Sequence, residues 1–332
     1  MALEYWEMIS IKDTELDSIL PDLQQIELDA ADLASEAGTI LFKYFGKPGI
    51  GKSNLGVEYK DANNTDPVTR ADTEVQQFLA KEISSRYPGH GVVGEEDKAK
   101  EGFVSETVWI LDPLDGTRNF LHGLPAFASS IGVLHKGVIV AGAIFLPWPG
   151  ESEGIVLHSS LGRGACINGE SLVTPQIESL DPAGIRTLPG SFSAAFKFEG
   201  GFGTKSGELR MAGSIAYELA LVALGVTQYA VVCGAHLWDV AAGISILTES
   251  GGNVLKHVKV PLGSRIIGSV DTWEEIGRLV EISETGHSKY EDFRKLSPPF
   301  LAAPASIISE MSANIISKNI GIRGMTGALF KR

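Results

Sequence analysis

The chain has 332 residues, of which 44% are hydrophobic and 21% charged. This length is enough for about two compact domains with sizeable cores, so the sequence is not that of a globally disordered protein. Its 41 acidic and 28 basic residues give a formal net charge of −13, which disfavours nucleic acids and anionic membranes as partners. Cys166 and Cys233 are too few for a disulfide framework and are predicted to be buried thiols in a reducing compartment. With no apolar run of membrane-spanning length and acids within residues 1–22, the composition predicts a cytoplasmic protein.

Two helices are predicted before the first sheet. Apolar residues at helical spacing predict the first helix over residues 28–45. After a stretch rich in Gly, Asn and Asp, Pro67 opens a second helix that stops before Pro88. The apolar run 108–111 then ends in Asp112, which is typical of a buried strand whose end meets a polar site.

The middle of the chain is rich in predicted strands. Residues 127–134 and 138–146 are predicted to form a hairpin, and residues 155–158 and 164–168 continue the strand pattern. Turn residues cluster at 181–184, after which strands and helices alternate.

The later elements and the domain division follow from the same patterns. Helices are predicted over 214–224, 238–249 and 306–318, and a strand over 229–232. We therefore predict an N-terminal α+β domain, a C-terminal α/β domain and a C-terminal extension. These units span residues 1–185, 186–290 and 291–332.

Acidic side chains are concentrated in three short segments. Asp112 and Asp115 follow the buried strand closely, so two carboxylates and a backbone carbonyl can converge where the chain turns. Glu95 and Glu96 lie earlier, and Asp239 stands at the start of a predicted helix. Grouped carboxylates repel one another, and Mg²⁺, which prefers oxygen ligands, relieves that repulsion. No Cys or His group in these segments has zinc-ligand spacing, so zinc is the weaker prediction.

Two small residues follow the paired aspartates. Gly116 lets the backbone approach a ligand closely, and Thr117 is predicted to cap a helix whose first N–H groups point at an anion. Each acidic segment alone is more typical of an Asx turn or a solvated loop. Their combination instead predicts adjoining metal and phosphate sites.

Residues 46–53 offer a competing motif. They match the P-loop pattern of a Gly, four residues and then Gly-Lys-Ser, which by itself predicts a nucleotide hydrolase. A P-loop needs a buried strand before it and a helix after it, whereas a predicted helix enters this segment and an extended or irregular stretch leaves it. We therefore interpret the segment as a loop after a helix C-terminus.

At the acidic segments the chain resembles the inositol monophosphatase family of magnesium-dependent, lithium-sensitive phosphatases. The likeness runs from about residue 28 to residue 256, and its motifs are residues 66–72, 94–96, 109–123, 164–169 and 236–243. The resemblance implies a fold of the α/β class that is built from α+β layers. Helices and sheets would alternate in an αβαβα sandwich, as in the inositol monophosphatases and fructose bisphosphatases. It also implies a homodimer.

The resemblance further implies two or three Mg²⁺ ions as cofactors. One would be held by Glu95, Asp112 and the carbonyl of Leu114, a second by Asp112, Asp115 and Asp239, and Glu95 would share a third. Catalytic roles are implied for Glu95, Thr117 and Asp72, the first two orienting an activated water that attacks phosphorus. Contacts to a small phosphate ester are implied for Asp115, Gly116, Thr117, Gly213, Ser214 and Asp239.

Two positions depart from the family's substrate pocket. Inositol-hydrolysing relatives have a Glu where this chain has Val232, and a small Ala where it has Ile215. Either the pocket accepts a different substrate, or both are core residues and other side chains contact the polyol. The implied substrate is inositol phosphate or a related sugar or polyol phosphate, with a histidinol-phosphate or nucleotide-type phosphatase as the alternative.

A third hypothesis comes from another class of function. An inactive family member acting as a scaffold or binding protein would use the altered pocket and the extension over 291–332. The retention of every metal carboxylate disfavours it. The predicted helix over 306–318 is too neutral on its polar face for a membrane anchor, and we expect it to pack on the domain or on a partner subunit.

Overall fold

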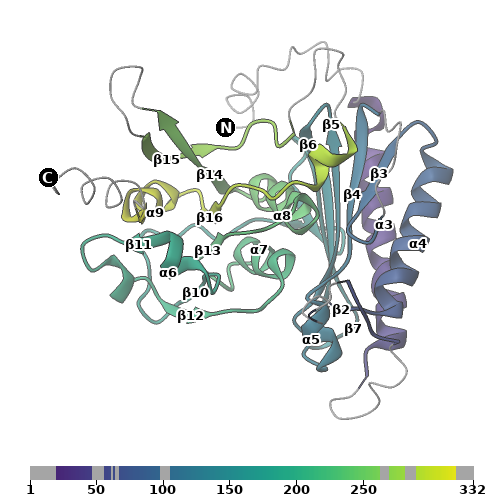
Figure 1. The fold of residues 1–332 in the computed structure, drawn as a ribbon, viewed down its shortest axis with the longest axis horizontal. Coiled ribbons are helices and arrows are strands. Elements are labelled where there is room, and N and C mark those ends of the chain that lie inside the picture. The colour runs from purple at the N-terminus through teal and green to yellow at the C-terminus, as the bar shows by residue number, and fades with distance from the viewer. Residues whose placement is uncertain are drawn as a thin grey trace, which may run out of the picture.

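Helices and sheets alternate in layers in the computed structural model, which describes residues 20–46, 56–60, 63, 67–97, 105–261, 269–280 and 289–318 (Figure 1). The helices are α3 (Leu20–Tyr44), α4 (Arg70–Arg86), α5 (Thr117–Leu121), α6 (Phe192–Ala195), α7 (Ile215–Ala223), α8 (Leu237–Glu249) and α9 (Ile308–Asn314). Two 3-10 turns accompany them, η2 (Phe202–Thr204) and η3 (Tyr290–Arg294).

The first sheet has seven strands in the order β3-β4-β5-β6-β7-β8-β9. Its strands are β3 (Gly91–Gly94), β4 (Thr107–Asp115), β5 (Ala128–His135), β6 (Val138–Trp148), β7 (Glu151–Ser160), β8 (Ala165–Ile167) and β9 (Glu170–Leu172). The β3–β4 pair is parallel and the other neighbours are antiparallel. Along β4, Val108 and Ile110 enter one core cluster and Trp109 and Leu111 the other. Because both faces of β4 are covered, its run from Val108 to Leu111 is apolar throughout.

The second sheet has six strands in the order β12-β10-β13-β16-β14-β15. Its strands are β10 (Ile185–Thr187), β12 (Glu208–Arg210), β13 (Tyr229–Val232), β14 (Gly252–Pro261), β15 (Ser269–Glu275) and β16 (Phe300–Pro304). The pairs that β10 forms are parallel and the others are antiparallel. Two small sheets pair β1 (Glu58–Tyr59) with β2 (Pro67–Val68), and β11 (Phe196–Phe198) with β17 (Ile315–Ser317).

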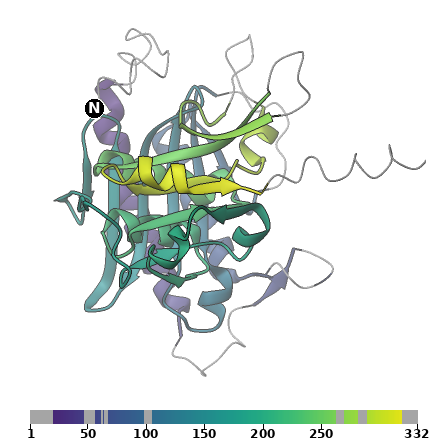
Figure 2. The same cartoon turned by 90° about the vertical axis from the view of Figure 1, so that its left-hand side faces the viewer.

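The layers follow the predicted αβαβα order. Helices α3 and α4 cover one face of the first sheet, α7 and α8 lie between the two sheets, and α6 and α9 pack beyond the second sheet (Figure 1). Figure 2 shows the strands of the second sheet running across those of the first. Within the described part of the chain, no helix has both the length and the apolar character needed to cross a membrane.

A pair of glycines lets α8 lie directly on the first sheet. Gly132 of β5 and Gly142 of β6 face each other in the register. A Cβ atom at Gly132 would stand 2.5 Å from the Cβ of Ala241, and one at Gly142 would stand 2.8 Å from the Cα of Ala242. These contacts fix the depth of the helix that carries Asp239.

The differences from the predicted elements have local causes. Helix α3 begins at Leu20 instead of residue 28, because the buried Leu23 and Ile26 extend its apolar stripe. Strand β3 was not predicted, since four residues offer too little pattern. The prediction of one helix over 306–318 was wrong: α9 ends at Asn314 and β17 follows, paired with β11.

The predicted division of the chain at residues 185 and 290 stays a prediction. The structure adds that the extension supplies β16, which lies between β13 and β14 inside the second sheet. Of the segment that resembles a P-loop, residues 47–53 lie outside the described residues.

We predict that Gly142→Ala lowers the free energy of unfolding by about 1–3 kcal/mol, because the new methyl group overlaps the backbone of α8. Urea denaturation of the variant and the wild type measures the difference. Gly89→Ala is the control: a Cβ there meets nothing within 4 Å, so a change of less than about 0.5 kcal/mol is expected. Equal stability of Gly142→Ala and the wild type would show that α8 is not seated through this glycine.

Candidate metal centre

Five acidic residues from four places in the fold approach one another. Asp112 and Asp115 belong to β4, Glu95 follows β3, Asp239 lies in the first turn of α8, and Asp72 lies in the first turn of α4. One carboxylate oxygen from each of Asp112, Asp115 and Asp239 lies within 4.8 Å of the others. The structure therefore brings together the carboxylates that the sequence separates by more than one hundred positions.

The end of β4 turns its two aspartates into the site. The β4–β5 register shifts between Asp112 and Asp115, and the Leu114 amide donates a 3.0 Å hydrogen bond to Asp112 Oδ1. The Glu95 amide donates to the Leu111 carbonyl at 3.0 Å, which continues the parallel pairing of β3 with β4. Glu95 and Asp112 are thereby held on neighbouring chain segments.

Asp72 reaches the site through a capping box at the start of α4. Its Oδ2 accepts a 2.8 Å hydrogen bond from the Thr69 amide, while the Thr69 hydroxyl accepts from the amide of Asp72. The Thr117 hydroxyl lies 3.2 Å from Asp72 Oδ1 and 3.1 Å from the Leu114 carbonyl oxygen, so it can donate to either. Thr117 is thus oriented by two acceptors.

The prediction that Thr117 caps a helix was wrong. Gly116 occupies the N-cap position of α5, with φ of +92°, and Thr117 is the first helical residue. A side chain at Gly116 would be strained by that φ, and its Cβ would lie 3.0 Å from the Ala126 carbonyl oxygen and the Ser214 Cβ. The close approach of three segments therefore selects glycine.

The start of α7 is joined to β4 through Asp115. Its Oδ2 accepts hydrogen bonds from the Ser214 hydroxyl at 2.9 Å and from the Ala216 amide at 2.6 Å. Gly213 precedes Ser214 with φ of +78°. Ser214, one of the predicted substrate-binding residues, thus touches a predicted metal ligand. On the other side of the site, Asp239 Oδ2 accepts from the His236 amide at 2.7 Å.

Burial and mutual repulsion raise the pKa values of these acids. Burial, strengthened by neighbouring carboxylates, holds the pKa values of Asp112 and Asp115 well above the usual range. Burial, with repulsion from Glu95, raises the pKa of Asp239 to about 7, that of Asp72 to about 6 and that of Glu96 to about 7. The site as folded therefore carries an electrostatic penalty.

Lys60 is a site residue that the sequence did not reveal. It follows β1, and its Nζ lies 2.7 Å from Glu95 Oε1 and 2.6 Å from Glu96 Oε1. Burial lowers the pKa of Lys60, but attraction to Glu95 and Glu96 outweighs this effect and raises it overall. The only sequence signal is an isolated Lys in a stretch rich in Gly and Asn, which does not predict contact with Glu95.

The three aspartates fit a hard divalent cation. Within the described ranges, no Lys or Arg lies at ion-pair distance from Asp112, Asp115 or Asp239. Their donor atoms are all oxygens, which suits Mg²⁺ better than zinc. The ring of His236 bonds the Arg294 carbonyl through Nδ1 at 3.0 Å and stacks on Trp238.

A second mixed cluster joins α3 to the first sheet. Glu27, His158 and Cys166 bring ligand atoms within 4.8 Å of one another. The Glu27 carboxylate already accepts from His158 Nδ1 at 2.8 Å and from the Ser160 hydroxyl, so its oxygens have partners. Cys166 and Cys233 are free thiols, and both are partly buried where full burial was predicted.

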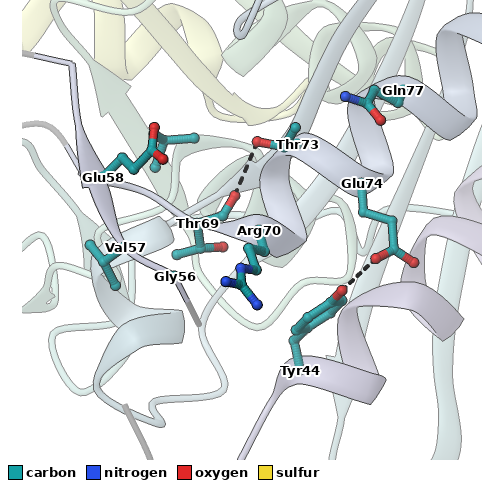
Figure 3. A pocket seen from close by; sticks show the side chains of 10 residues that line it. Tyr44, Gly56, Val57, Glu58, Thr69, Arg70, Thr73, Glu74 and Gln77 are labelled. Atoms are coloured by element: carbon teal, nitrogen blue, oxygen red, sulfur yellow. Dashed lines mark hydrogen bonds between the residues drawn. The ribbon is translucent and has the colours of Figure 1, made fainter. Parts of the chain in front are cut away.

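A hollow of about 600 Å³ lies beside the N-terminal half of α4 (Figure 3). Figure 3 shows Arg70 at this hollow and Tyr44 hydrogen-bonded to Glu74. Its lining residues include none of the five clustered acids. The hollow therefore does not contain the clustered acids, and it adjoins them through Thr69, which bonds Asp72.

The two positions that depart from the expected pocket lie in or against the core. Val232 of β13 is 2% exposed and shares a core cluster with Ala230, and the partly buried Ile215 packs against the same cluster. The structure supports the alternative in which both are core residues.

We predict that, in the absence of divalent cations, the stability of the protein falls as the pH rises from about 4 to about 7. In this range the folded chain keeps protons on Asp239, Asp72 and Glu96 that the unfolded chain, with pKa values near 4, has released. The folded state binds more protons, so the free energy of unfolding decreases with pH.

Thermal melts in EDTA across this range measure the decrease. Asp239→Asn removes one of the titrating groups and should give a shallower decrease, whereas Glu153→Gln, an exposed site, should match the wild type. An Asp239→Asn variant with the wild-type slope would contradict the prediction.

Comparison with known proteins agrees with this geometry. The model of the inositol monophosphatase family matches residues 22–280. The chain is 37% identical over 227 residues to an inositol-1-monophosphatase of Mesorhizobium japonicum, covering 67% of this chain and 81% of that protein. It is 32% identical over 231 residues to the Nus factor SuhB of Pseudomonas aeruginosa, covering 67% and 81%.

A solved structure agrees as well. The IMPase of Thermotoga maritima matches with a TM-score of 0.62 at 25% identity, covering 87% of this chain and 96% of that one. The family match takes in all five clustered acids. The chain belongs to the inositol monophosphatase family.

Proposed function

We propose that the protein is a Mg²⁺-dependent phosphomonoesterase that hydrolyses a small phosphate monoester, with inositol phosphate or a related sugar or polyol phosphate as its substrate. The convergence of the buried Asp112 with the partly buried Asp115 and Asp239 carries this proposal. These three side chains offer oxygen ligands and, within the described ranges, no Lys or Arg forms an ion pair with them. Membership of a family whose relatives are named inositol monophosphatases supports a phosphatase.

The proposed ligand sets are those that the family resemblance implies, and the clustering of Asp112, Asp115 and Asp239 supports the second of them. Glu95, Asp112 and the Leu114 carbonyl would hold one Mg²⁺, and Asp112, Asp115 and Asp239 a second. We propose two or three ions in all, and Glu95 would bind the third as well as the first. When bound, Mg²⁺ activates water as a nucleophile and neutralises the charge that develops on the leaving oxygen.

The chain's own residues supply positioning. The Thr117 hydroxyl lies near Asp72 and the Leu114 carbonyl and, together with Glu95, would orient the attacking water. The amides of Gly116 and Thr117 stand at the start of α5, where N–H groups lack partners within the helix, and would bind phosphate oxygens. Catalysis would then rest on orientation and electrostatic stabilisation.

The ester's leaving group would lie between the end of β4 and the starts of α7 and α8. Gly213 and Ser214 precede α7, and Asp239 lies in the first turn of α8. The Ser214 hydroxyl bonds Asp115 at the end of β4. With Val232 in the core, no acidic side chain stands at that position to contact a polyol. A histidinol-phosphate or nucleotide-type substrate is therefore the second candidate. The homodimer and the cytoplasmic location implied by the sequence remain predictions.

We predict that Asp112→Asn lowers kcat/KM for phosphate-ester hydrolysis on the order of 100-fold or more, because it removes a charge shared by both proposed ion sites. Asp181→Asn, at an exposed turn, is the matched control and should behave like the wild type. EDTA should abolish turnover, Mg²⁺ should restore it, and Li⁺ should inhibit it. Full activity in the presence of EDTA, and again in the presence of Li⁺, would overturn the mechanism.

A substrate panel separates the remaining alternatives. At equal Mg²⁺, we expect the largest kcat/KM for inositol or sugar phosphates over histidinol phosphate and nucleotide phosphates. A preference for histidinol phosphate or a nucleotide phosphate would change the proposed substrate class, and the protein would still be a phosphatase. One relative is named as a Nus factor, so the panel must also test the hypothesis that this protein is an inactive family member that acts as a scaffold. Equal inertness of the wild type and Asp112→Asn across the panel would favour the scaffold hypothesis.

A further inference from the structure

Arg294 connects the acidic centre to a segment beyond the family match, which ends at residue 280. It is the last residue of η3 and is partly buried. One guanidinium nitrogen donates a 2.8 Å hydrogen bond to the Gly94 carbonyl, and the other donates a 3.2 Å bond to the Glu95 carbonyl. The planar fork of arginine thus holds the backbone on both sides of the Gly94–Glu95 peptide link.

The same residue contacts the start of α8. Its guanidinium carbon lies 4.9 Å from the centre of the Trp238 ring, at a distance typical of a cation–π contact. Its backbone carbonyl accepts the His236 Nδ1 hydrogen bond, and His236 stacks on Trp238 with ring centres 4.4 Å apart. The amide of His236 in turn donates to Asp239. Arg294 therefore touches both segments that flank the acidic centre.

Among the described residues, the charge of Arg294 is not used in an ion pair. In the ranges that the structure describes, no carboxylate lies at ion-pair distance from it. Its guanidinium donates to the Gly94 and Glu95 carbonyls and, at 3.5 Å, to the Tyr290 hydroxyl, all of them neutral acceptors. Its contribution is therefore to the position of the Glu95 segment. The direct backbone link from Glu95 to the sheet is its hydrogen bond to the Leu111 carbonyl.

We propose that Arg294 is a positioning residue that sets the place of Glu95 relative to Asp239 and so strengthens Mg²⁺ binding. The proposal rests on the proposed function, which makes both acids metal ligands. Loss of the arginine fork would leave the Glu95 segment free to shift away from α8 under the repulsion of the neighbouring carboxylates. A lysine keeps the charge but cannot bond two carbonyls in the same planar geometry.

Isothermal calorimetry of Mg²⁺ binding, without substrate, tests the proposal. We expect Arg294→Lys and Arg294→Ala to weaken Mg²⁺ binding about tenfold or more, as residues that orient metal ligands commonly do. In turnover, the Mg²⁺ concentration for half-maximal rate should rise likewise, while saturating Mg²⁺ returns kcat of Arg294→Lys near the wild-type value.

Arg86→Lys is the matched control. It alters an arginine whose side chain is 30% exposed and bonds Asp29 at the other end of α4, and it should leave Mg²⁺ affinity unchanged. Wild-type affinity in a folded Arg294→Lys, or an equal loss in Arg86→Lys, would overturn the proposal. If Arg294→Ala does not fold, Arg294→Lys decides.

The outcomes also separate the two proposals. A wild type that binds Mg²⁺ but hydrolyses no ester would refute the proposed function, and calorimetry would still decide the role of Arg294. A wild type that binds no Mg²⁺ would refute both.

Discussion

Repulsion among buried and partly buried carboxylates is the constraint on which the rest of the structure depends. Each of four acids is held by at least one backbone N–H group that donates to it, from Leu114 to Asp112, from Ala216 to Asp115, from His236 to Asp239 and from Thr69 to Asp72. The backbone groups belong to strands and helices that pack in the two core clusters on either side of the first sheet. The carboxylates therefore cannot separate without moving whole elements. Hydrophobic burial throughout the layers opposes the electrostatic penalty.

The sheets and helices divide the task of holding the site. The first sheet supplies Asp112 and Asp115 from one strand end, where the register shift turns both side chains to the same side. The middle helix layer supplies Asp239, at a depth set by Gly132 and Gly142. The cleavage chemistry proposed for the site thus depends on packing between layers as much as on the acids themselves.

The sequence predicted those parts of the site whose signals are local. An apolar run followed by Asp112 and Asp115 marks a strand end, and Asp239 stands at a recognisable helix start. The contacts of Lys60 and Arg294 could not be predicted, because each arises from segments that meet only after folding. Likewise, the isoleucines of β17 suit either a helix or a strand, and pairing with β11 decided between them.

The place of β16 also has a consequence for how the protein is made. All strands of the first sheet lie within residues 91–172, so that layer can assemble while later residues are still being synthesised. The second sheet cannot close until Phe300–Pro304 has emerged, because this strand separates β13 from β14. Until then the nascent chain exposes two open strand edges to other polypeptides, a hazard for aggregation that ends only when β16 has paired with β13 and β14.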